Sequence, residues 1–151
     1  MNARSPIKSF ADLEVYQNSY KGSIEVTTKI VPKLPKEEQR DLANQMRRSA
    51  KAVPRLIAEG YSKKHQSKGF QKYLDDAMAE SNEMIVCLNH ARDLYSRYVD
   101  PELCEQLIDL YDKSSRQLYN LARKWRDFKR GWGLRASRIV RSSFDTSIAT
   151  D

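Results

Sequence analysis

The sequence predicts an all-α protein, an up-down-up-down antiparallel four-helix bundle. First, hydrophobic residues make up 40% of the 151 residues and charged residues 31%, with only five glycines and five prolines, which is typical of a helical domain with its own core. Second, apolar residues recur at intervals of three and four in four segments. Third, short stretches containing proline or glycine separate these segments, and short connections join antiparallel neighbours.

We expect the first helix at residues 10–31. Ser9 or Asp12 can cap its start, because both side chains accept hydrogen bonds from backbone N–H groups. The helix should end before Pro32 and Pro35, which form a stiff turn. Its core face is predicted to include Leu13, Tyr16, Tyr20 and Ile24.

The second helix is predicted at residues 36–59. Its apolar positions are Leu42, Met46, Ala50, Val53 and Ile57, and its cations Arg40, Arg47, Arg48, Lys51 and Arg55 fall on a nearly opposite face. Pro54 lies inside this helix, where a proline costs ~3 kcal/mol and kinks the axis. Glu59 and Gly60 are expected to form the C-terminal stop.

The third and fourth helices are predicted at residues 67–98 and 101–130. Ser67 can cap the third helix, and Asp100 can cap the fourth with Pro101 in its first position. The third core face comprises Phe70, Leu74, Ala77, Ser81, Met84, Leu88, Ala91 and Tyr95. The fourth comprises Leu103, Leu107, Leu110, Tyr111, Ser114, Leu118, Leu121, Trp125 and Phe128.

Two terminal segments flank the expected bundle of residues 9–130. Residues 1–8 form an N-terminal arm, and residues 131–151 form a basic, mostly flexible C-terminal tail. Several aromatic residues fall outside the apolar stripes, which indicates self-association, because one bundle core cannot bury them all: Tyr61, Tyr98, Tyr119 and Trp132.

The residues disfavour an enzyme or a metal protein. His90 follows Cys87 by three positions, but only Cys104 could be added to them, and a structural zinc site needs four ligands. We therefore expect both cysteines to be reduced core thiols, and no catalytic residue, metal or cofactor. The chain start has no hydrophobic signal segment and no run long enough to span a membrane, so we expect a cytoplasmic protein without a membrane partner.

Charge is distributed unevenly. The net charge is +7, and between Lys113 and Arg141 Asp127 is the single acidic residue among many cations. This asymmetry favours an anionic partner such as nucleic acid. The alternative is a solvated helix face with a solubilising tail.

Three stretches resemble a known family over residues 9–130. They are Phe10-x-Asp12-Leu13-Glu14-Val15-Tyr16-Gln17, then Leu34-Pro35-Lys36-x-Glu38 leading to Leu42, Gln45, Arg48 and Ala50, and Val53-Pro54-x-x-Ile57-Ala58-Glu59-Gly60. The third is the most specific, since few helices keep a proline four residues ahead of an Ala-Glu-Gly stop. On these residues the chain resembles the four helix bundle proteins encoded in intervening sequences of 23S rRNA genes. It departs from them at Leu56, where the family usually has Asn.

The resemblance implies an antiparallel bundle that assembles into a ring-shaped homopentamer. A related bundle, the accessory variability determinant of diversity-generating retroelements, works with a reverse transcriptase and binds nucleic acid through a basic surface. RNA or DNA and a reverse transcriptase are therefore expected partners beside further copies of the chain.

The basic residues form the candidate nucleic-acid site. The alternatives are that these cations pair with Asp75 or Glu80 inside the bundle, or that the protein is a scaffold whose charges dock subunits or partners. Any nucleic-acid contact should be directed at backbone and shape, because no base-reading motif is present. The candidate residues are Arg47, Arg48, Lys51, Arg55, Lys63, Lys64, Lys68, Arg123, Lys124 and Arg130.

Overall fold

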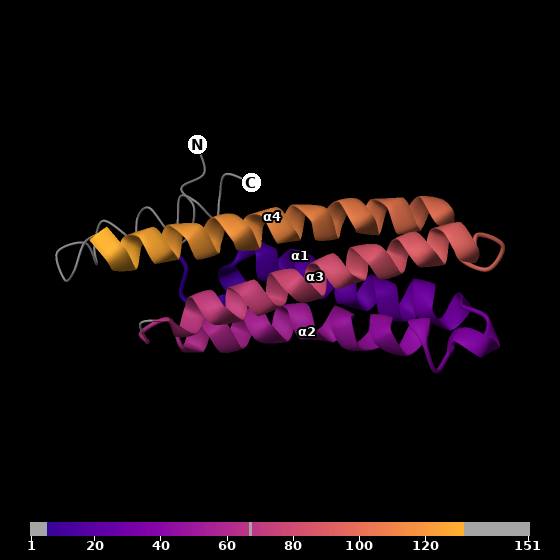
Figure 1. The fold of residues 1–151 in the computed structure, drawn as a ribbon, viewed down its shortest axis with the longest axis horizontal. Helices are drawn as coiled ribbons and strands as arrows, with labels where there is room; N and C mark the ends of the chain where they lie inside the picture. The colour runs from indigo at the N-terminus through magenta and orange to yellow at the C-terminus, as the bar shows by residue number, and fades with distance from the viewer. Residues whose placement is uncertain (1–5, 67, 132–151) are drawn as a thin grey trace.

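The described part of the chain folds into four α-helices and contains no strand. The computed structural model describes residues 6–66 and 68–131, with side chains as far as Asp127. The predictions for the first residues of the arm, Ser67, the Arg130 side chain, Trp132 and the tail lie outside it. The all-α fold is confirmed, and Figure 1 shows the helices lying side by side along the long axis of the molecule. The helices are α1 (Glu14–Glu25), α2 (Leu42–Ser62), α3 (Gly69–Leu94) and α4 (Pro101–Gly131).

Helix α1 is shorter than the predicted 10–31, because different helical geometries occupy both ends of that range. A 3₁₀ turn, Phe10–Asp12, precedes it, and a π-helical turn, Val26–Ile30, follows it. Ser9 caps the 3₁₀ turn: its Oγ accepts from the Ala11 N–H at 3.2 Å, and Asp12 Oδ2 accepts from the Ser9 N–H at 3.0 Å. Backbone hydrogen bonds from Lys8 and then Ser9 lower the pKa of Asp12.

The inner face of α1 differs from the predicted one. Tyr20 and Ile24 were expected in the core, but they are 52% and 48% exposed. The helix instead buries small residues, Ser19, Gly22 and Ser23, along with Val15. The prediction is confirmed for Leu13, which is fully buried, but it was wrong for Tyr20 and Ile24, because hydrophobic spacing cannot indicate which face of a helix allows the closer approach.

Gly22 explains that choice of face. A Cβ added at Gly22 would lie 3.0 Å from both Leu110 Cδ2 and Tyr111 Oη of α4. This distance is tight for a carbon atom, so the absent side chain lets α1 pack closely on α4.

Helix α2 buries the apolar face predicted for it, but its ends differ from 36–59. A 3₁₀ turn, Lys36–Glu38, occupies the expected start, and the helix continues through Pro54 to Ser62. Gly60 therefore does not end the helix. It is buried, and a Cβ there would lie 2.7 Å from Tyr73 Cβ of α3, so its role is close packing of α2 on α3.

An aromatic cluster joins the end of α2, the start of α3 and the end of α4. Tyr61 is only 9% exposed and packs edge-to-face on Phe70, with ring centroids 6.1 Å apart. Phe70 stacks on Trp125 at 5.2 Å. The prediction that Tyr61 lies outside the core was wrong, because the helix extends far enough to turn its ring inward.

The buried positions predicted for α3 and α4 are largely confirmed, although α3 is shorter than 67–98. Its residues from Phe70 to Ala91 on the expected face are buried, whereas Tyr95 is half-buried. Asp100 begins α4 as predicted, since its Oδ1 accepts from the Glu102 N–H at 3.0 Å. Helix α3 packs on α2 and α4, and α1 packs on the same two helices.

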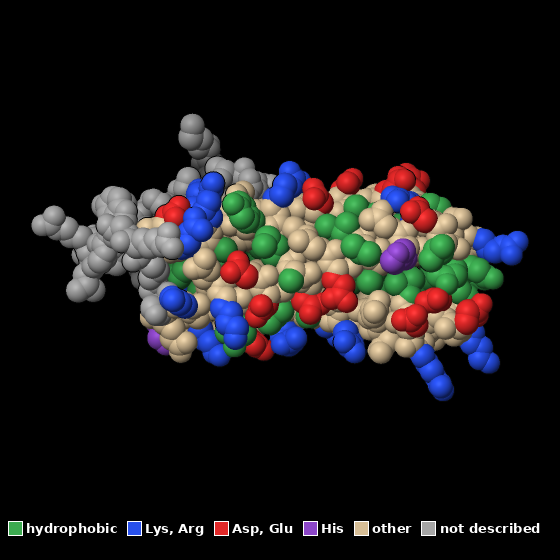
Figure 2. Space-filling model, viewed as in Figure 1, with side chains coloured by type: hydrophobic (Ala, Val, Ile, Leu, Met, Phe, Trp, Pro, Cys, Tyr) green, Lys and Arg blue, Asp and Glu red, His purple; other side chains and the backbone are tan. Residues whose placement is uncertain are grey.

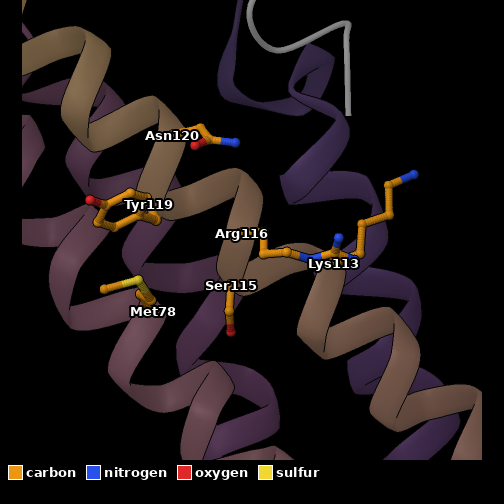
Figure 3. A pocket seen from close by; sticks show the side chains of 6 residues that line it. All are labelled: Met78, Lys113, Ser115, Arg116, Tyr119 and Asn120. Carbon is orange, nitrogen blue, oxygen red and sulfur yellow. The ribbon is translucent and has the colours of Figure 1, made fainter.

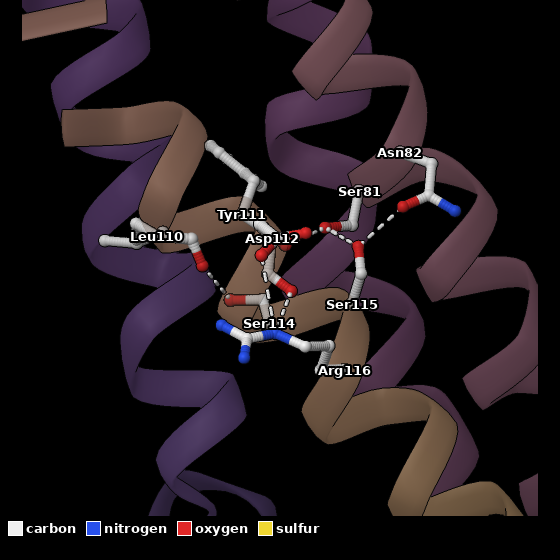
Figure 4. A network of polar contacts seen from close by, with 8 residues as sticks. All are labelled: Ser81, Asn82, Leu110, Tyr111, Asp112, Ser114, Ser115 and Arg116. Carbon is white, nitrogen blue, oxygen red and sulfur yellow. Dashed lines mark hydrogen bonds and ion pairs between the residues drawn. The ribbon is translucent and has the colours of Figure 1, made fainter. Parts of the chain in front are cut away.

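A polar network crosses the α3–α4 contact (Figure 4). The Ser81 hydroxyl donates to the Tyr111 carbonyl oxygen at 2.9 Å. The Ser115 hydroxyl lies 2.8 Å from Ser81 Oγ and 2.8 Å from Asn82 Oδ1, and can donate to either. These bonds satisfy buried hydroxyl groups and hold the two helices in register. Among the helices described, none is long and apolar enough to cross a membrane.

Candidate nucleic-acid interface

Two of the predicted site residues on α2 are exposed and have no interaction partner among the described residues. Arg48 and Lys51 lie on the outer face, opposite the buried Met46, Ala50 and Val53. Within the described part of the chain neither one makes a hydrogen bond or an ion pair, so the predicted pairing of Arg48 with an acidic residue of α3 is not observed there. Both charges are therefore free to contact an anion.

Arg47 and Arg55 each interact with another residue of the chain. Arg47 donates through Nη2 to Gln39 Oε1 at 2.6 Å and through Nη1 to the Gln39 carbonyl oxygen at 3.3 Å. These bonds tie the start of α2 to the preceding turn. Arg55 pairs with Glu59 at 3.4 Å, and both side chains are exposed, so that pair contributes little to stability.

Two lysines of the α2–α3 loop contact tyrosine side chains. Lys63 Nζ donates to Tyr73 Oη at 2.8 Å, and this hydrogen bond raises the pKa of Lys63. Lys64 Nζ lies 3.9 Å from the centroid of the Tyr61 ring. Cation–π contact holds the loop charges near the end of the bundle while leaving them accessible to solvent.

The fold brings the loop cations and the α4 cations to one end of the bundle. Arg123 and Lys124 are exposed and make no hydrogen bond or ion pair within the described residues, whereas Arg126 pairs with Asp127 at 3.3 Å. The aromatic cluster places them at the same end as the loop. We call this group the basic end, and it comprises Lys63, Lys64, Lys68, Arg123 and Lys124.

The α2 cations are a separate group. Fifteen residues separate Arg48 from Lys63, which corresponds to ~22 Å along a helix. On the face drawn in Figure 2, more Lys and Arg side chains lie toward the end that holds the start of α3, and others project from the opposite end. Asp and Glu side chains are more frequent toward the middle and the other end.

The acidic residues of α3 do not neutralise the α2 cations. Burial is the main cause that raises the pKa of Asp75, neighbouring Asp76 adds to it, and Arg126 of α4 opposes it. The cation that acts on Asp75 therefore belongs to α4. In the residues with described side chains, neither Asp75 nor Glu80 forms an ion pair with α2.

A shallow depression on the outer surface of α4 was not predicted from the sequence. A depression of ≈ 670 Å³ is lined by one residue of α3 and several of α4. In Figure 3, Tyr119 and Met78 lie together on one side of α4, and Arg116 and Lys113 lie on the other. The spacing Arg-x-x-Tyr-x-x-x-Arg from 116 to 123 was the feature of the sequence that could have indicated this depression. The lining residues are Met78, Lys113, Ser115, Arg116, Tyr119 and Asn120.

The cysteines carry no reactive thiolate. Cys87 and Cys104 are buried and not joined to each other, and burial raises the pKa of each thiol to about 11. Over the described ranges no group of three or more His, Cys, Asp or Glu side chains could hold a metal ion.

Together the fold and these surfaces define a class of protein: a small helical bundle that presents basic side chains at its surface. The family described as 23S rRNA-intervening sequence protein matches residues 11–120, a range that runs from before α1 into α4. The chain belongs to this family, which confirms the resemblance noted in its sequence. No curated protein and no solved structure matches the chain.

Proposed function

We propose that this protein is a non-enzymatic, homo-oligomeric helical bundle that binds RNA or DNA through its basic surfaces. The observation that carries the proposal is the basic end, where cations from two distant parts of the sequence gather: Lys68, Arg123 and Lys124 are exposed, and Lys63 and Lys64 lie against tyrosine rings. Phosphate groups bind well to cations spaced a few ångströms apart on a firm surface. The family description names a 23S rRNA intervening sequence, which is compatible with an RNA-associated role.

The proposal includes the assembly and the role implied by the resemblance. The helices alternate in direction, which the short connections at residues 63–68 and 95–100 support, and the copies form a ring-shaped pentamer. Repetition around a ring would turn one small basic end into a large positive surface. The protein would then act as an accessory to a reverse transcriptase or to another RNA-associated complex.

A protein–protein scaffold is the second candidate. It is favoured by apolar side chains that remain exposed: Tyr20 and Ile24 on α1 at 52% and 48%, and Val86 and Leu94 on α3 at 54% and 65%. Contiguous patches of exposed apolar side chains commonly mark interaction surfaces. A subunit interface would account for them equally well, so they are compatible with both candidates.

Salt-dependent binding tests the proposal. Labelled RNA and DNA are titrated with the full chain, and fluorescence anisotropy is followed from low to physiological salt. Phosphate binding predicts a steep loss of affinity with salt. The Arg123→Ala/Lys124→Ala variant should bind more weakly, with a salt slope reduced by about 1 to 2.

The matched control is Lys21→Ala/Lys33→Ala, which removes two exposed cations outside the basic end. Its net charge equals that of the Arg123→Ala/Lys124→Ala variant. An equal loss of affinity in this control would show that only net charge matters. Absence of binding to either polymer at low salt would refute the nucleic-acid function. Native mass spectrometry tests the assembly, and a monomer would refute the ring.

A further inference from the structure

We propose that the depression beside Tyr119 binds one unpaired nucleotide of a single-stranded nucleic acid, with the base on the tyrosine ring and the phosphate on the neighbouring cations. This inference rests on the proposed nucleic-acid binding. It adds that the nucleic acid is single-stranded and that the binding site lies on α4. The depression lies on the outer surface of α4, beside the basic end, and none of its lining residues is among the candidate nucleic-acid residues predicted from the sequence.

One side of the depression is apolar and flat. Tyr119 is 55% exposed, and Met78 of α3 lines the depression beside it, as Figure 3 shows. An exposed aromatic ring supported from a second helix offers a stacking platform to any base, because every base has a π face. The sulfur of Met78 can contact the edge of a bound ring.

The other side of the depression is cationic. Lys113 Nζ pairs with Glu14 of α1 at 3.1 Å, and Arg116 Nε lies 3.4 Å from Asp112 Oδ2. The first pair is half-buried, with side chains 40% and 38% accessible, whereas the second is exposed, at 68% and 60%, so a phosphate can replace Asp112 at little cost.

Arg116 retains donors for such a phosphate. Its contacts within the described residues use Nε alone, which leaves both Nη groups available for the bidentate geometry that guanidinium groups make with phosphate. Arg123 lies one helical turn beyond Tyr119 and carries an uncommitted charge. Arg116 and Arg123 are ~10 Å apart along the axis, which suits phosphates on the two sides of a stacked base.

The exposed tyrosine ring and the cations around it together distinguish single-stranded from double-stranded nucleic acid. A cation gradient along α4 alone would be explained by the helix dipole, which favours positive charge near the C-terminal end. The dipole does not explain an exposed aromatic ring placed between the cations. A duplex cannot use that ring, since its bases are stacked on one another, so the site favours unpaired nucleotides over double helices.

The experiment measures binding of the full chain to a labelled single strand of about 12 nucleotides and to a duplex of the same length, both as RNA and as DNA. Tyr119→Ala should weaken single-strand binding ~10-fold and leave the salt slope unchanged, because stacking releases no counterions. Tyr119→Phe should restore the affinity. Arg116→Ala should lower the salt slope by about 0.7.

Tyr98→Ala is the matched control, since Tyr98 is also an exposed tyrosine, at 49%, but lies in the connection between α3 and α4. It should bind as the wild type does. Equal affinity of Tyr119→Ala and the wild type, or an equal loss for duplex and single strand, would overturn the inference while leaving the proposed function in place. A wild type that binds no nucleic acid would overturn both.

Native mass spectrometry of Tyr119→Ala tests whether Tyr119 lies in a subunit interface instead. An unchanged assembly is expected. A shift to a smaller assembly would assign Tyr119 to a subunit interface and would also overturn the inference.

Discussion

Replacing Gly60 by alanine tests whether close packing of α2 on α3 holds the basic end together. In an unhindered helix this change is stabilising by up to about 1 kcal/mol, because alanine is the better helix former. Here the added Cβ would lie 2.7 Å from Tyr73 Cβ. We therefore expect the opposite sign.

The magnitude follows from the geometry. Carbon atoms in contact prefer separations of about 3.5 to 4.0 Å, so the two helices must move apart by roughly 1 Å. Tyr73 Cβ is attached directly to the backbone of α3 and cannot rotate away. Overpacking of this kind costs about 1–3 kcal/mol, which outweighs the gain in helix propensity and leaves a net loss of about 1 kcal/mol.

Urea and thermal unfolding followed by far-ultraviolet circular dichroism measure the effect. Gly60→Ala should lower the free energy of unfolding by about 1 kcal/mol and Tm by about 2–4 °C. Glu59→Ala, at the exposed neighbouring position, should change the free energy of unfolding by less than about 0.5 kcal/mol. A Gly60→Ala protein more stable than the wild type would refute the close-packing argument.

Three further predictions concern the core. Tyr111 Oη is buried and has no hydrogen-bond partner in the described structure, so Tyr111→Phe should raise the free energy of unfolding by about 1 kcal/mol in urea titration, and a loss would contradict this. Ser115→Ala removes the hydroxyl that lies 2.8 Å from Ser81 Oγ and should cost about 1 kcal/mol; an unchanged Tm would count against the network. Burial raises the pKa of Cys87 and Cys104 from 9.0 to about 11, so the folded state holds these protons more tightly than the unfolded state. Stability should be full below pH 9 and fall as pH rises toward 11, and a Cys87→Ala/Cys104→Ala variant should show a shallower fall of Tm with pH over that window.

Local patterns predicted much of the fold because they depend only on helix geometry. The spacing of Phe70, Leu74 and Ala77 indicated the buried face of α3, and the same rule placed Arg48 and Lys51 on the outside of α2. The cap at Asp100 was also predictable, since a side chain and a backbone group a few residues apart make it.

The candidate site was predicted less completely. Arg47 follows the same helical spacing as the other α2 cations, so it was predicted to be available for binding. Its partner, Gln39, lies in the turn before α2, and helical spacing does not indicate that contact. Tyr119 was noted only as an aromatic residue outside the stripe, because nothing local indicates that Met78 of another helix lies beside it.

By itself, the sequence determined the helical class, the core faces of α2, α3 and α4, the basic outer face of α2 and the family. Only the tertiary structure decided that α1 turns its glycine inward and Tyr20 outward, that Gly60 packs helices together, and that the loop cations and Arg123 share one end. Periodicity is a property of one helix, whereas close approach and convergence depend on the backbone and side chains of the helix it meets.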